Sequence, residues 1–360
     1  MTDKNRYDRQ IVLPEIGQNG QQRLADSSVL CVGAGGLGCP ALLYLAAAGI
    51  GRIGIIDFDN VDETNLQRQV LFTIHDIGKN KAEAAKEHLQ HLNPEISIQV
   101  YAHELTDKNA QGLFHNYDII IDGTDNFATK FLINDTAIKT DTPFIYGSIL
   151  GFDGQISVFN HQNGPCYRCL FPEPPQGYIP NCAEAGVIGA VAGMIGTTQA
   201  MEAIKIITNH ESFTPLSGKL WTIDTKSMES RTLSLPKNPE CPTCSKPKEA
   251  IFLQYTSPVC GYVSETTPDQ ARDNNAALLI DVRERDEWDA GHIAGAQHLA
   301  LSLLMRGDKP DLDLNTEIIL YCQKGPRGVR AAQILKQHGY LNISNMAGGY
   351  HAWLEQSKAP

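Results

Sequence analysis

A single stretch, residues 29–59, constrains the fold of this chain more than any other. It reads VLCVGAGGLGCPALLYLAAAGIGRIGIIDFD, which is an apolar run, a glycine-rich turn, a segment of small residues, a second apolar run and then acids. This order predicts a strand, a turn, a helix and a second strand, the βαβ unit typical of nucleotide-binding domains. Because the first turn of a helix has unpaired N–H groups, such a turn is suited to bind a phosphate.

The turn contains four glycines, Gly33, Gly35, Gly36 and Gly38. Gly33 permits the tight turn, Gly35 lets the backbone approach a phosphate, and Gly38 lets the helix pack close to the strand. Asp57 follows 19 residues after Gly38 and is placed to accept hydrogen bonds from ribose hydroxyl groups. The stretch by itself decides neither the nucleotide nor the reaction.

The composition limits the classes of partner. The 360 residues suggest two domains, and 42% hydrophobic with 20% charged residues is ordinary for a soluble globular protein. The net charge of −11 argues against direct binding to nucleic acid or to an anionic membrane. The sequence shows no signal peptide, and we expect a cytoplasmic protein. The longest uncharged run, between Glu184 and Glu202, is not hydrophobic enough to cross a membrane and predicts a tightly packed helix.

Strand-like and helix-like segments alternate through the first part of the chain. This alternation predicts an α/β fold with a Rossmann-like, mostly parallel sheet covered by helices on both faces. Residues 118–122, DIIID, form a predicted buried strand that leads into Asp125. Ligands of such sheets bind at the carboxyl ends of the strands, where Asp57 and Asp59 also lie. We therefore expect these acids to converge on one crevice.

The second part of the chain starts a new pattern. Residues 217–235 predict two or three antiparallel strands, after which the periodicity is lost. We expect a first domain at residues 1–248, a linker at 249–257 and a second, small α/β domain at 258–360. The second domain opens with Thr-Pro-Asp-Gln at 267–270, the signature of a capped helix start.

The chain has nine cysteines, which point to metal or thiol chemistry more than to disulfides. Four of them form two CxxC pairs: Cys166, Cys169, Cys241 and Cys244. Two such pairs can supply four thiolates to one tetrahedral Zn²⁺, so the sequence predicts a zinc knuckle with a structural role. Redox or incidental pairs are the alternative, which is disfavoured because neither pair opens a thioredoxin-like helix after a strand.

Cys322 is the strongest candidate for a reactive thiol. It ends a predicted strand and is followed by a glycine-containing turn and a helix, in IILYCQKGPRGVRAAQIL. Backbone N–H groups of this turn, with Lys324, Arg327 and Arg330, create a positive potential that favours the thiolate nucleophile. A buried structural cysteine is the alternative, and it fits poorly with so polar a loop. Cys182 lies in a second loop, GYIPNCAEAGV.

These motifs together resemble two known families. Residues from about 5 to 247 resemble the adenylyltransferases that activate sulfur-carrier proteins, in the ubiquitin-activating superfamily, and are most similar to the molybdopterin-synthase and thiamine-pathway types. The motifs are RYDRQ, GAGGLGCP, DFDNVDETNLQRQ, GKNKAEAA, DGTDN, GQISVF, PCYRCLFPEPP, NCAEAGV and CPTC. From about 258 onward, LIDVRERDEWDAGHIAGAQHL, YCQKGPRG and NMAGGYHAW resemble a rhodanese domain.

The resemblance implies an ATP site on the glycine turn, with Asp57 at the ribose and Asp125 holding Mg²⁺. It also implies that Asn65, Arg68 and Lys81 contact the phosphates. Attack by a carboxylate on an α-phosphate brings two anions together, so the reaction needs cations that neutralise the developing charge.

The resemblance also implies the partners. The C-terminal Gly-Gly carboxylate of a small ubiquitin-like sulfur-carrier protein would be adenylated by MgATP. Cys322, loaded as a persulfide by a donor such as a cysteine desulfurase, would then deliver sulfur and leave a thiocarboxylate. Cys182 matches the mobile-loop cysteine of the family, and its order of action relative to Cys322 is open. Arg9 would reach the active site of a second subunit, which implies a homodimer.

The chain departs from the rhodanese pattern in one place. The loop usually carries Ser or Thr after its arginine, but here Gly328 stands at that position, and Pro326 stiffens the turn. This departure leaves the preference for a sulfur donor open. We interpret Asp281, Arg283 and His292 as framework residues.

Several functions compete with this hypothesis. A nicotinamide-dependent dehydrogenase would explain the glycine turn but not the cysteine clusters or the second domain. A non-catalytic module that docks a carrier tail and an activator of a modifier for protein conjugation are two further alternatives. Among the sulfur pathways we favour molybdopterin cofactor biosynthesis, with thiamine biosynthesis and transfer-RNA thiolation as alternatives.

Overall fold

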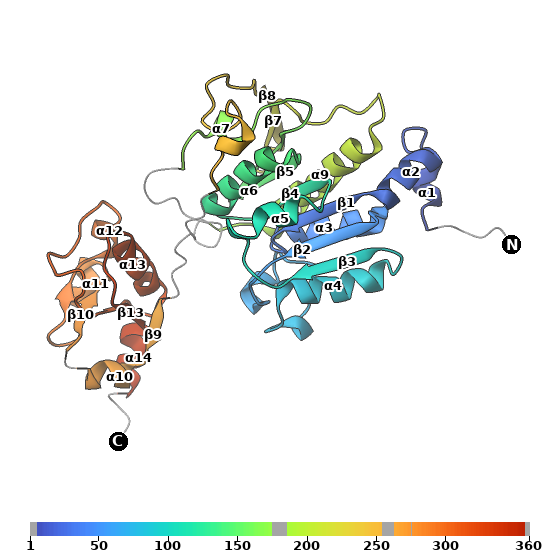
Figure 1. Ribbon diagram of the computed structural model, residues 1–360. Helices are drawn as coiled ribbons and strands as arrows, with labels where there is room; N and C mark the ends of the chain where they lie inside the picture. Colours follow the sequence, from blue (N-terminus) through green and yellow to red (C-terminus); the bar gives the residue numbers. More distant parts are fainter. Residues whose placement is uncertain (1–5, 175–185, 254–262, 275, 357–360) are drawn as a thin grey trace. The chain divides into compact units, whose positions relative to one another are not determined.

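A computed structural model describes residues 6–174, 186–253, 263–274 and 276–356 (Figure 1). The chain forms two compact units, Met1–Tyr255 and Thr256–Pro360. Part of the expected linker at 249–257 lies outside the described residues, so its limits stay a prediction.

The first unit is built on an eight-stranded sheet with the order β3-β2-β1-β4-β5-β6-β7-β8. Its strands are β1 Ser28–Val32, β2 Arg52–Ile56, β3 Ser97–Tyr101, β4 Ile119–Asp122, β5 Phe144–Leu150, β6 Asp153–Phe159, β7 Lys219–Asp224 and β8 Glu229–Ser234. The strands from β3 to β5 pair in parallel, and β5 to β8 form an antiparallel extension. The expected mostly parallel sheet is therefore confirmed for the nucleotide-binding half, and the expected antiparallel strands follow it.

Helices cover both faces of this sheet (Figure 1). They are α1 Asp8–Ile11, α2 Gly17–Asp26, α3 Gly38–Ala48, α4 Lys81–Leu92, α5 Ala110–Phe114, α6 Phe127–Thr140, α7 Tyr167–Leu170 and α9 Gly189–Thr208, with 3₁₀ turns at Glu63–Asn65, Ile74–Asp76 and Lys248–Ala250. One apolar core joins the sheet to α3, α4 and α9, and a second joins its other face to α5 and α6. Because both faces are covered, the central strands are continuous apolar runs, as in β1, where all five residues are buried.

The strand order shows where a ligand crevice is expected in this sheet. β1 lies between β2 and β4, so the connections from β1 and β4 leave the sheet at a point where the winding reverses. In parallel α/β sheets, ligands bind at such a point, outside the carboxyl ends of the strands. The backbones after these two strands approach closely, since a Cβ on Gly33 would lie 3.0 Å from the carbonyl oxygen of Gly123.

Residues 189–201 of the uncharged run lie in the helix α9, which packs against α3 and the sheet. A Cβ on Gly196 would lie only 2.3 Å from the carbonyl oxygen of Leu37, so this glycine allows the close approach of α9. Among the helices that the structure describes, none combines the length and the apolar character needed to cross a membrane.

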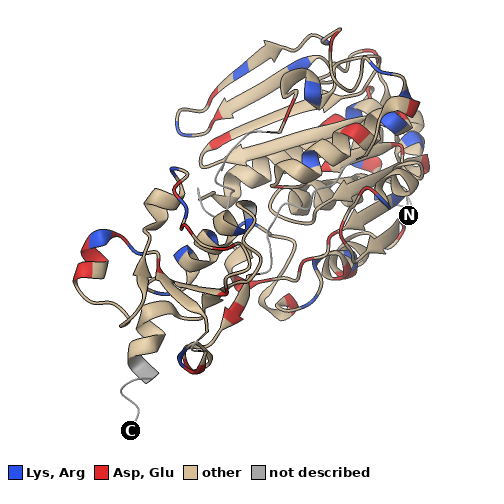
Figure 2. Cartoon of the chain, turned by 60° about the vertical axis from the view of Figure 1, so that its left-hand side comes forward, with Lys and Arg blue, Asp and Glu red and all other residues tan. Residues whose placement is uncertain are grey.

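The second unit is a smaller, all-parallel sheet with the order β11-β10-β12-β13-β9. Its elements are β9 Ser264–Thr266, β10 Leu278–Asp281, β11 Gln297–His298, β12 Ile318–Tyr321, β13 Ile343–Met346, α10 Pro268–Asp273, α11 Arg285–Asp289, α12 Leu301–Leu304, α13 Pro326–Gln337 and α14 Gly349–Gln356. The predicted capping box is present, because the side chains of Thr267 and Gln270 each accept a hydrogen bond from the backbone N–H of the other. Acidic and basic residues are interspersed along the chain (Figure 2).

Candidate functional sites

A cavity of about 680 Å³ opens at the carboxyl ends of β1 and β4. Eight of the residues that the sequence predicts for nucleotide binding line it: Gly33, Gly35, Gly36, Asp57, Asn65, Arg68, Lys81 and Asp125. They come from four separate segments of the chain, which meet at this one crevice.

The glycine turn has the backbone that the sequence predicts. Gly33 has a φ of +92°, a left-handed conformation that side chains rarely allow. Gly38 begins α3, and a Cβ there would lie 2.0 Å from the carbonyl oxygen of Gly33. At Gly35 the nearest atoms would lie 3.9 Å away, so its missing side chain leaves room in the cavity itself.

Asp57 shapes this turn as well as lining the cavity. Its Oδ2 accepts a hydrogen bond from the N–H of Ala34 at 2.8 Å, and its Oδ1 accepts one from the N–H of Asp59 at 2.9 Å. Burial raises the pKa of Asp57 above its ordinary value, and the charge of Lys81 opposes this rise. Each carboxylate oxygen retains a second lone pair that can accept a bond from a ligand hydroxyl.

Two of the cations that line the cavity are Lys81 and Arg68, which come from different elements. Lys81, at the start of α4, is buried, and its Nζ lies 2.8 Å from Oδ2 of Asp59. The aliphatic part of Arg68 lies against Gly36, where a Cβ would meet it at 3.5 Å. Its guanidinium donates a hydrogen bond to the carbonyl oxygen of Thr64 at 3.2 Å.

The turn after β4 presents Asp125, whose side chain is exposed to the cavity. Asp122 holds this turn, because its Oδ1 accepts hydrogen bonds from the N–H of Thr124 at 3.0 Å and from the Thr124 hydroxyl at 2.7 Å. Its Oδ2 forms a buried ion pair with Lys130 of α6 at 2.8 Å. Lys130 also donates to the carbonyl oxygen of Gly147 at 2.9 Å and lines the cavity.

The sequence patterns do not identify Asp122 and Lys130 as residues of this site. One signal could have identified this pair. Lys130 lies one turn after the predicted helix start, among largely buried helix residues, and eight residues after an acid that ends a strand. A charge at such a position needs a buried partner.

Two predicted catalytic residues are not placed in this cavity. Arg9 lies exposed on α1, and its neighbour Gln10 donates a hydrogen bond to the carbonyl oxygen of Ala48 at 3.1 Å, at the end of α3 opposite the glycine turn. An 11-residue helix is about 16 Å long, and Arg9 is not among the described residues that line the cavity. Cys182 lies outside the described residues.

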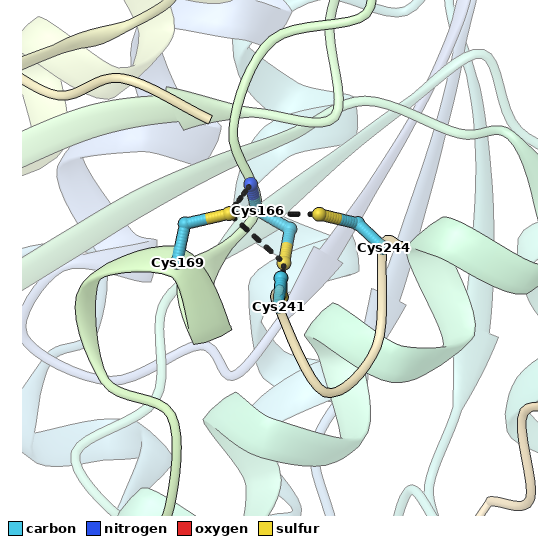
Figure 3. A group of neighbouring side chains, drawn as sticks. All are labelled: Cys166, Cys169, Cys241 and Cys244. Carbon is cyan, nitrogen blue, oxygen red and sulfur yellow. Dashed lines mark hydrogen bonds between the residues drawn. The ribbon is translucent and has the colours of Figure 1, made fainter. Parts of the chain in front are cut away.

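The four predicted metal ligands come together in the first unit (Figure 3). Their sulfur atoms all lie within 4.8 Å of one another, with 3.5 Å between Cys166 and Cys241 and 3.5 Å between Cys169 and Cys244. A zinc ion with Zn–S bonds of about 2.3 Å in a tetrahedron requires sulfur atoms about 3.8 Å apart.

The chemistry of the four thiols also fits a metal cation. A hydrogen bond with Cys166 lowers the pKa of Cys244 to about 5, whereas the same bond and burial raise the pKa of Cys166. Thiols this close cannot all ionise unless a cation compensates their charge. The cluster is therefore compatible with a zinc knuckle whose ligand positions are all filled by protein.

The second unit places Cys322 at the end of β12, in the loop before α13. The residue is 1% exposed, and its sulfur accepts a hydrogen bond from the N–H of Gly325 at 3.1 Å. Glu287 binds the guanidinium of Arg327 through two bonds of 2.6 and 2.7 Å. This pairing, and to a smaller extent Cys322, raises the pKa of Arg327, so the guanidinium acts on both groups. Lys324 is exposed on the loop.

The departure at Gly328 has a structural partner. A Cβ on Gly328 would lie 2.1 Å from Oδ1 of Asn345, a residue of β13 that is 1% exposed. Within the described part of the chain, neither polar atom of the Asn345 side chain has a hydrogen-bond partner. The carboxamide therefore occupies the room that a serine or threonine side chain would need.

One of the framework residues contacts the same loop. Arg283 forms a buried ion pair with Asp281 at 2.7 Å and donates a hydrogen bond to Oε1 of Gln323, in the Cys322 loop, at 3.0 Å. The His292 ring stacks on Trp288 with 3.6 Å between centroids. These contacts give the three residues structural roles, as the sequence predicts.

The fold and these sites define a protein with a nucleotide-binding α/β unit that has a four-cysteine knuckle, followed by a small α/β unit that presents a thiol in a loop of backbone N–H groups. Comparisons with known proteins agree with this class. Residues 7–243 match the ThiF family model, and residues 267–356 match the rhodanese-like domain model.

Similar proteins share both units or the first alone. The chain is 41% identical over 371 residues to the probable adenylyltransferase/sulfurtransferase MoeZ of Mycobacterium tuberculosis, covering 98% of this chain and 93% of that protein. It is 44% identical over 264 residues to the sulfur carrier protein adenylyltransferase of Thermus thermophilus, covering 71% of this chain and 96% of that protein. The crystal structure of E. coli MccB superposes with a TM-score of 0.60 at 25% identity, over 69% of this chain and 74% of that one.

The chain therefore belongs to the ThiF family and has a C-terminal rhodanese-like domain. It is an enzyme of the adenylyltransferase and sulfurtransferase class. This class sets aside the nicotinamide-dependent dehydrogenase and the non-catalytic docking module.

Proposed function

We propose that the enzyme adenylates the C-terminal Gly-Gly carboxylate of a small ubiquitin-like sulfur-carrier protein and then converts it to a thiocarboxylate. The observation that carries the first step is the cavity at the ends of β1 and β4, which combines the glycine turn with Arg68, Lys81 and Asp125. Its phosphate end combines cations with an exposed carboxylate, so the bound nucleotide is positioned to react as well as to be held.

In this proposal the triphosphate lies along the glycine turn, and the ribose hydroxyl groups donate to Asp57. Asn65, Arg68 and Lys81 contact the phosphates. Asp125 holds Mg²⁺, which supplies charge neutralisation at the phosphates when it is bound. The carboxylate oxygen of the carrier attacks the α-phosphorus, the bond to pyrophosphate breaks, and the carrier acyl-adenylate forms.

The second step uses Cys322. A donor such as a cysteine desulfurase leaves a persulfide on its sulfur, where the N–H of Gly325 already donates a hydrogen bond. The outer sulfur attacks the acyl-adenylate carbonyl and AMP leaves, which gives an acyl disulfide with Cys322. A thiolate, which we assign to Cys182, attacks the Cys322 sulfur and releases the thiocarboxylate. The resulting disulfide is reopened by a thiol reductant.

We further propose a homodimer in which Arg9 completes the site of the second copy. The support is its exposed position near the end of α3 that is remote from the glycine turn of its own subunit. The reduced thiols that the second step requires are stable in the cytoplasm, where we place the enzyme.

We assign the carrier to molybdopterin cofactor biosynthesis, although the motifs of residues 5–247 resemble both the molybdopterin-synthase and the thiamine-pathway adenylyltransferases. Thiamine biosynthesis and transfer-RNA thiolation are alternatives with the same chemistry.

The test is a panel of candidate carriers, each incubated with the enzyme, MgATP and a persulfide donor. Mass spectrometry then detects exchange of oxygen for sulfur at the carrier C-terminus. Oxygen-to-sulfur exchange on the molybdopterin carrier supports the assignment. If this exchange occurs only on another carrier, the enzyme belongs to the pathway of that carrier instead. A carrier joined to a protein by an isopeptide bond, with no thiocarboxylate, contradicts the proposed function.

A further inference from the structure

The four-cysteine centre and the ATP cavity are adjacent along the chain. Cys169 lies in α7, and the next four residues, 170–173, form part of the cavity wall. This wall includes no residue of a strand and only the last residue of α7, so its position depends on contacts with other elements. Phe171 supplies one such contact, since its ring lies 5.1 Å from that of the buried Tyr167.

Arg168, between the cysteines of the first pair, supplies the second contact. It donates hydrogen bonds to both carboxylate oxygens of Asp135, each at 2.7 Å, and its third nitrogen donates to the carbonyl oxygen of Pro172 at 3.0 Å. The guanidinium also stacks on Phe131, with 4.5 Å to the ring centroid. All three guanidinium nitrogens are therefore engaged, one of them with the cavity wall.

Asp135 connects this arrangement to the rest of the site. It lies in α6, the helix whose first turn contributes Phe127, Thr129 and Lys130 to the cavity. Its Oδ1 also accepts a hydrogen bond from the hydroxyl of Thr243, between the cysteines of the second pair, at 3.3 Å. Both CxxC loops thus meet at one carboxylate, and Arg168 links this carboxylate to the cavity wall.

A metal with four cysteine ligands needs neither Arg168 nor Asp135. Burying an ion pair costs desolvation free energy, and a well-packed apolar pair is often as stable, so the pair calls for a role besides stability. We propose that Arg168 is a positioning residue for the ATP site, which fixes wall 170–173 to α6 and to the four-cysteine centre. This proposal rests on the proposed function, in which the cavity binds ATP.

The test is the R168Q variant of the full chain, with R231Q as the matched control. Arg231 is an exposed arginine of the same unit, and its ion pair with Glu229 spans 4.0 Å. We expect R168Q to weaken ATP binding and to raise KM for ATP by about tenfold, the effect of losing one hydrogen bond to a charged group. We also expect kcat at saturating ATP to stay within about twofold, because the reacting groups are unchanged.

Metal content and the midpoint of thermal unfolding separate positioning from a general loss of structure. The four thiolates are intact in R168Q, so we expect it to retain the metal of the wild type. If R168Q loses metal or fails to fold, D135N provides the second test, since it weakens the same link without shortening the side chain. ATP affinity within twofold of wild type in a folded, metal-containing variant overturns the proposal. Absence of ATP binding in the wild type overturns the proposed function instead.

Discussion

This molecule has two loops at the ends of central parallel strands whose backbones are alike and whose surroundings differ. The first follows β1 and contains Gly33 and Gly38, and the second follows β12 and contains Cys322 and Gly325. Each leads directly into a helix, so each offers backbone N–H groups to a negative charge.

The surroundings of the loops differ. Side chains from three other segments, including Arg68, Lys81 and Asp125, reach the first loop. At the second loop, Arg327 is already bound to Glu287, and the sulfur belongs to the chain itself. A ligand that binds reversibly needs affinity and selectivity from many residues, whereas a covalently held sulfur mainly needs a supporting backbone. The loops should therefore respond differently to the same kinds of substitution.

The largest effect is expected from removing the carboxylate at the first loop. D125A should lower the rate of carrier-dependent ATP–pyrophosphate exchange by about 10²–10³, because a group that neutralises transition-state charge is lost. Persulfide transfer from the second unit to a small thiol should be unchanged. Exchange close to the wild-type rate would remove Asp125 from the reaction.

A glycine pair sharpens the description of the first loop. G38A should destabilise the protein by about 1–3 kcal/mol, because its Cβ would lie 2.0 Å from a backbone oxygen that cannot move freely. G35A should change the free energy of unfolding by less than about 0.5 kcal/mol and still weaken ATP binding, since its Cβ enters the cavity. Denaturant unfolding and ATP titration measure the two effects, and equal destabilisation by both variants would contradict this division.

The second loop should depend on its packing with β13. G328S restores the residue type usual in rhodanese loops, yet we expect it to lower sulfur transfer about tenfold, because Asn345 fills the space. The double variant G328S/N345A should recover most of this loss, a coupling typical of residues in contact. If G328S alone is fully active, Asn345 does not constrain the loop.

The smallest effect concerns the Arg327–Glu287 pair. The hydrogen bond that Arg327 donates to Glu287 lowers the pKa of Glu287 below the ordinary value of 4.5. The pair therefore stabilises the fold above pH 4.5, and this contribution is lost as the pH falls through the lowered pKa. The difference in stability between wild type and E287Q should close on acidification. The control is D289N, which removes an exposed ion pair with Arg285. If the stability difference between wild type and E287Q does not depend on pH, the Arg327–Glu287 pair does not contribute.

The sequence predicts the strand–turn–helix core well, because apolar runs and glycines act locally. It also predicts the four-cysteine cluster, since two CxxC pairs have few other uses. It misses α2, because the segment GQNGQQRLAD is mostly polar. Its Leu24 is buried in a core to which α9, far along the chain, also contributes. For the same reason it misses the Asp122–Lys130 pair, which forms because α6 packs against the sheet with Lys130 on the side of Asp122.

The departure at Gly328 shows this limit most clearly. The sequence identifies the unusual residue, but the side chain that replaces the missing hydroxyl group comes from β13. Only the parallel pairing of β12 with β13, where Leu320 lies beside Asn345, brings the two positions together.

We infer that adenylation and sulfur delivery are separate steps at separate loops. The most direct measurement uses the C322A variant with the sulfur carrier, MgATP and a persulfide donor. We expect ATP–pyrophosphate exchange at the wild-type rate and no thiocarboxylate in the mass spectrum of the carrier. Loss of exchange together with the thiocarboxylate, in a folded variant, would contradict the separation of the two steps.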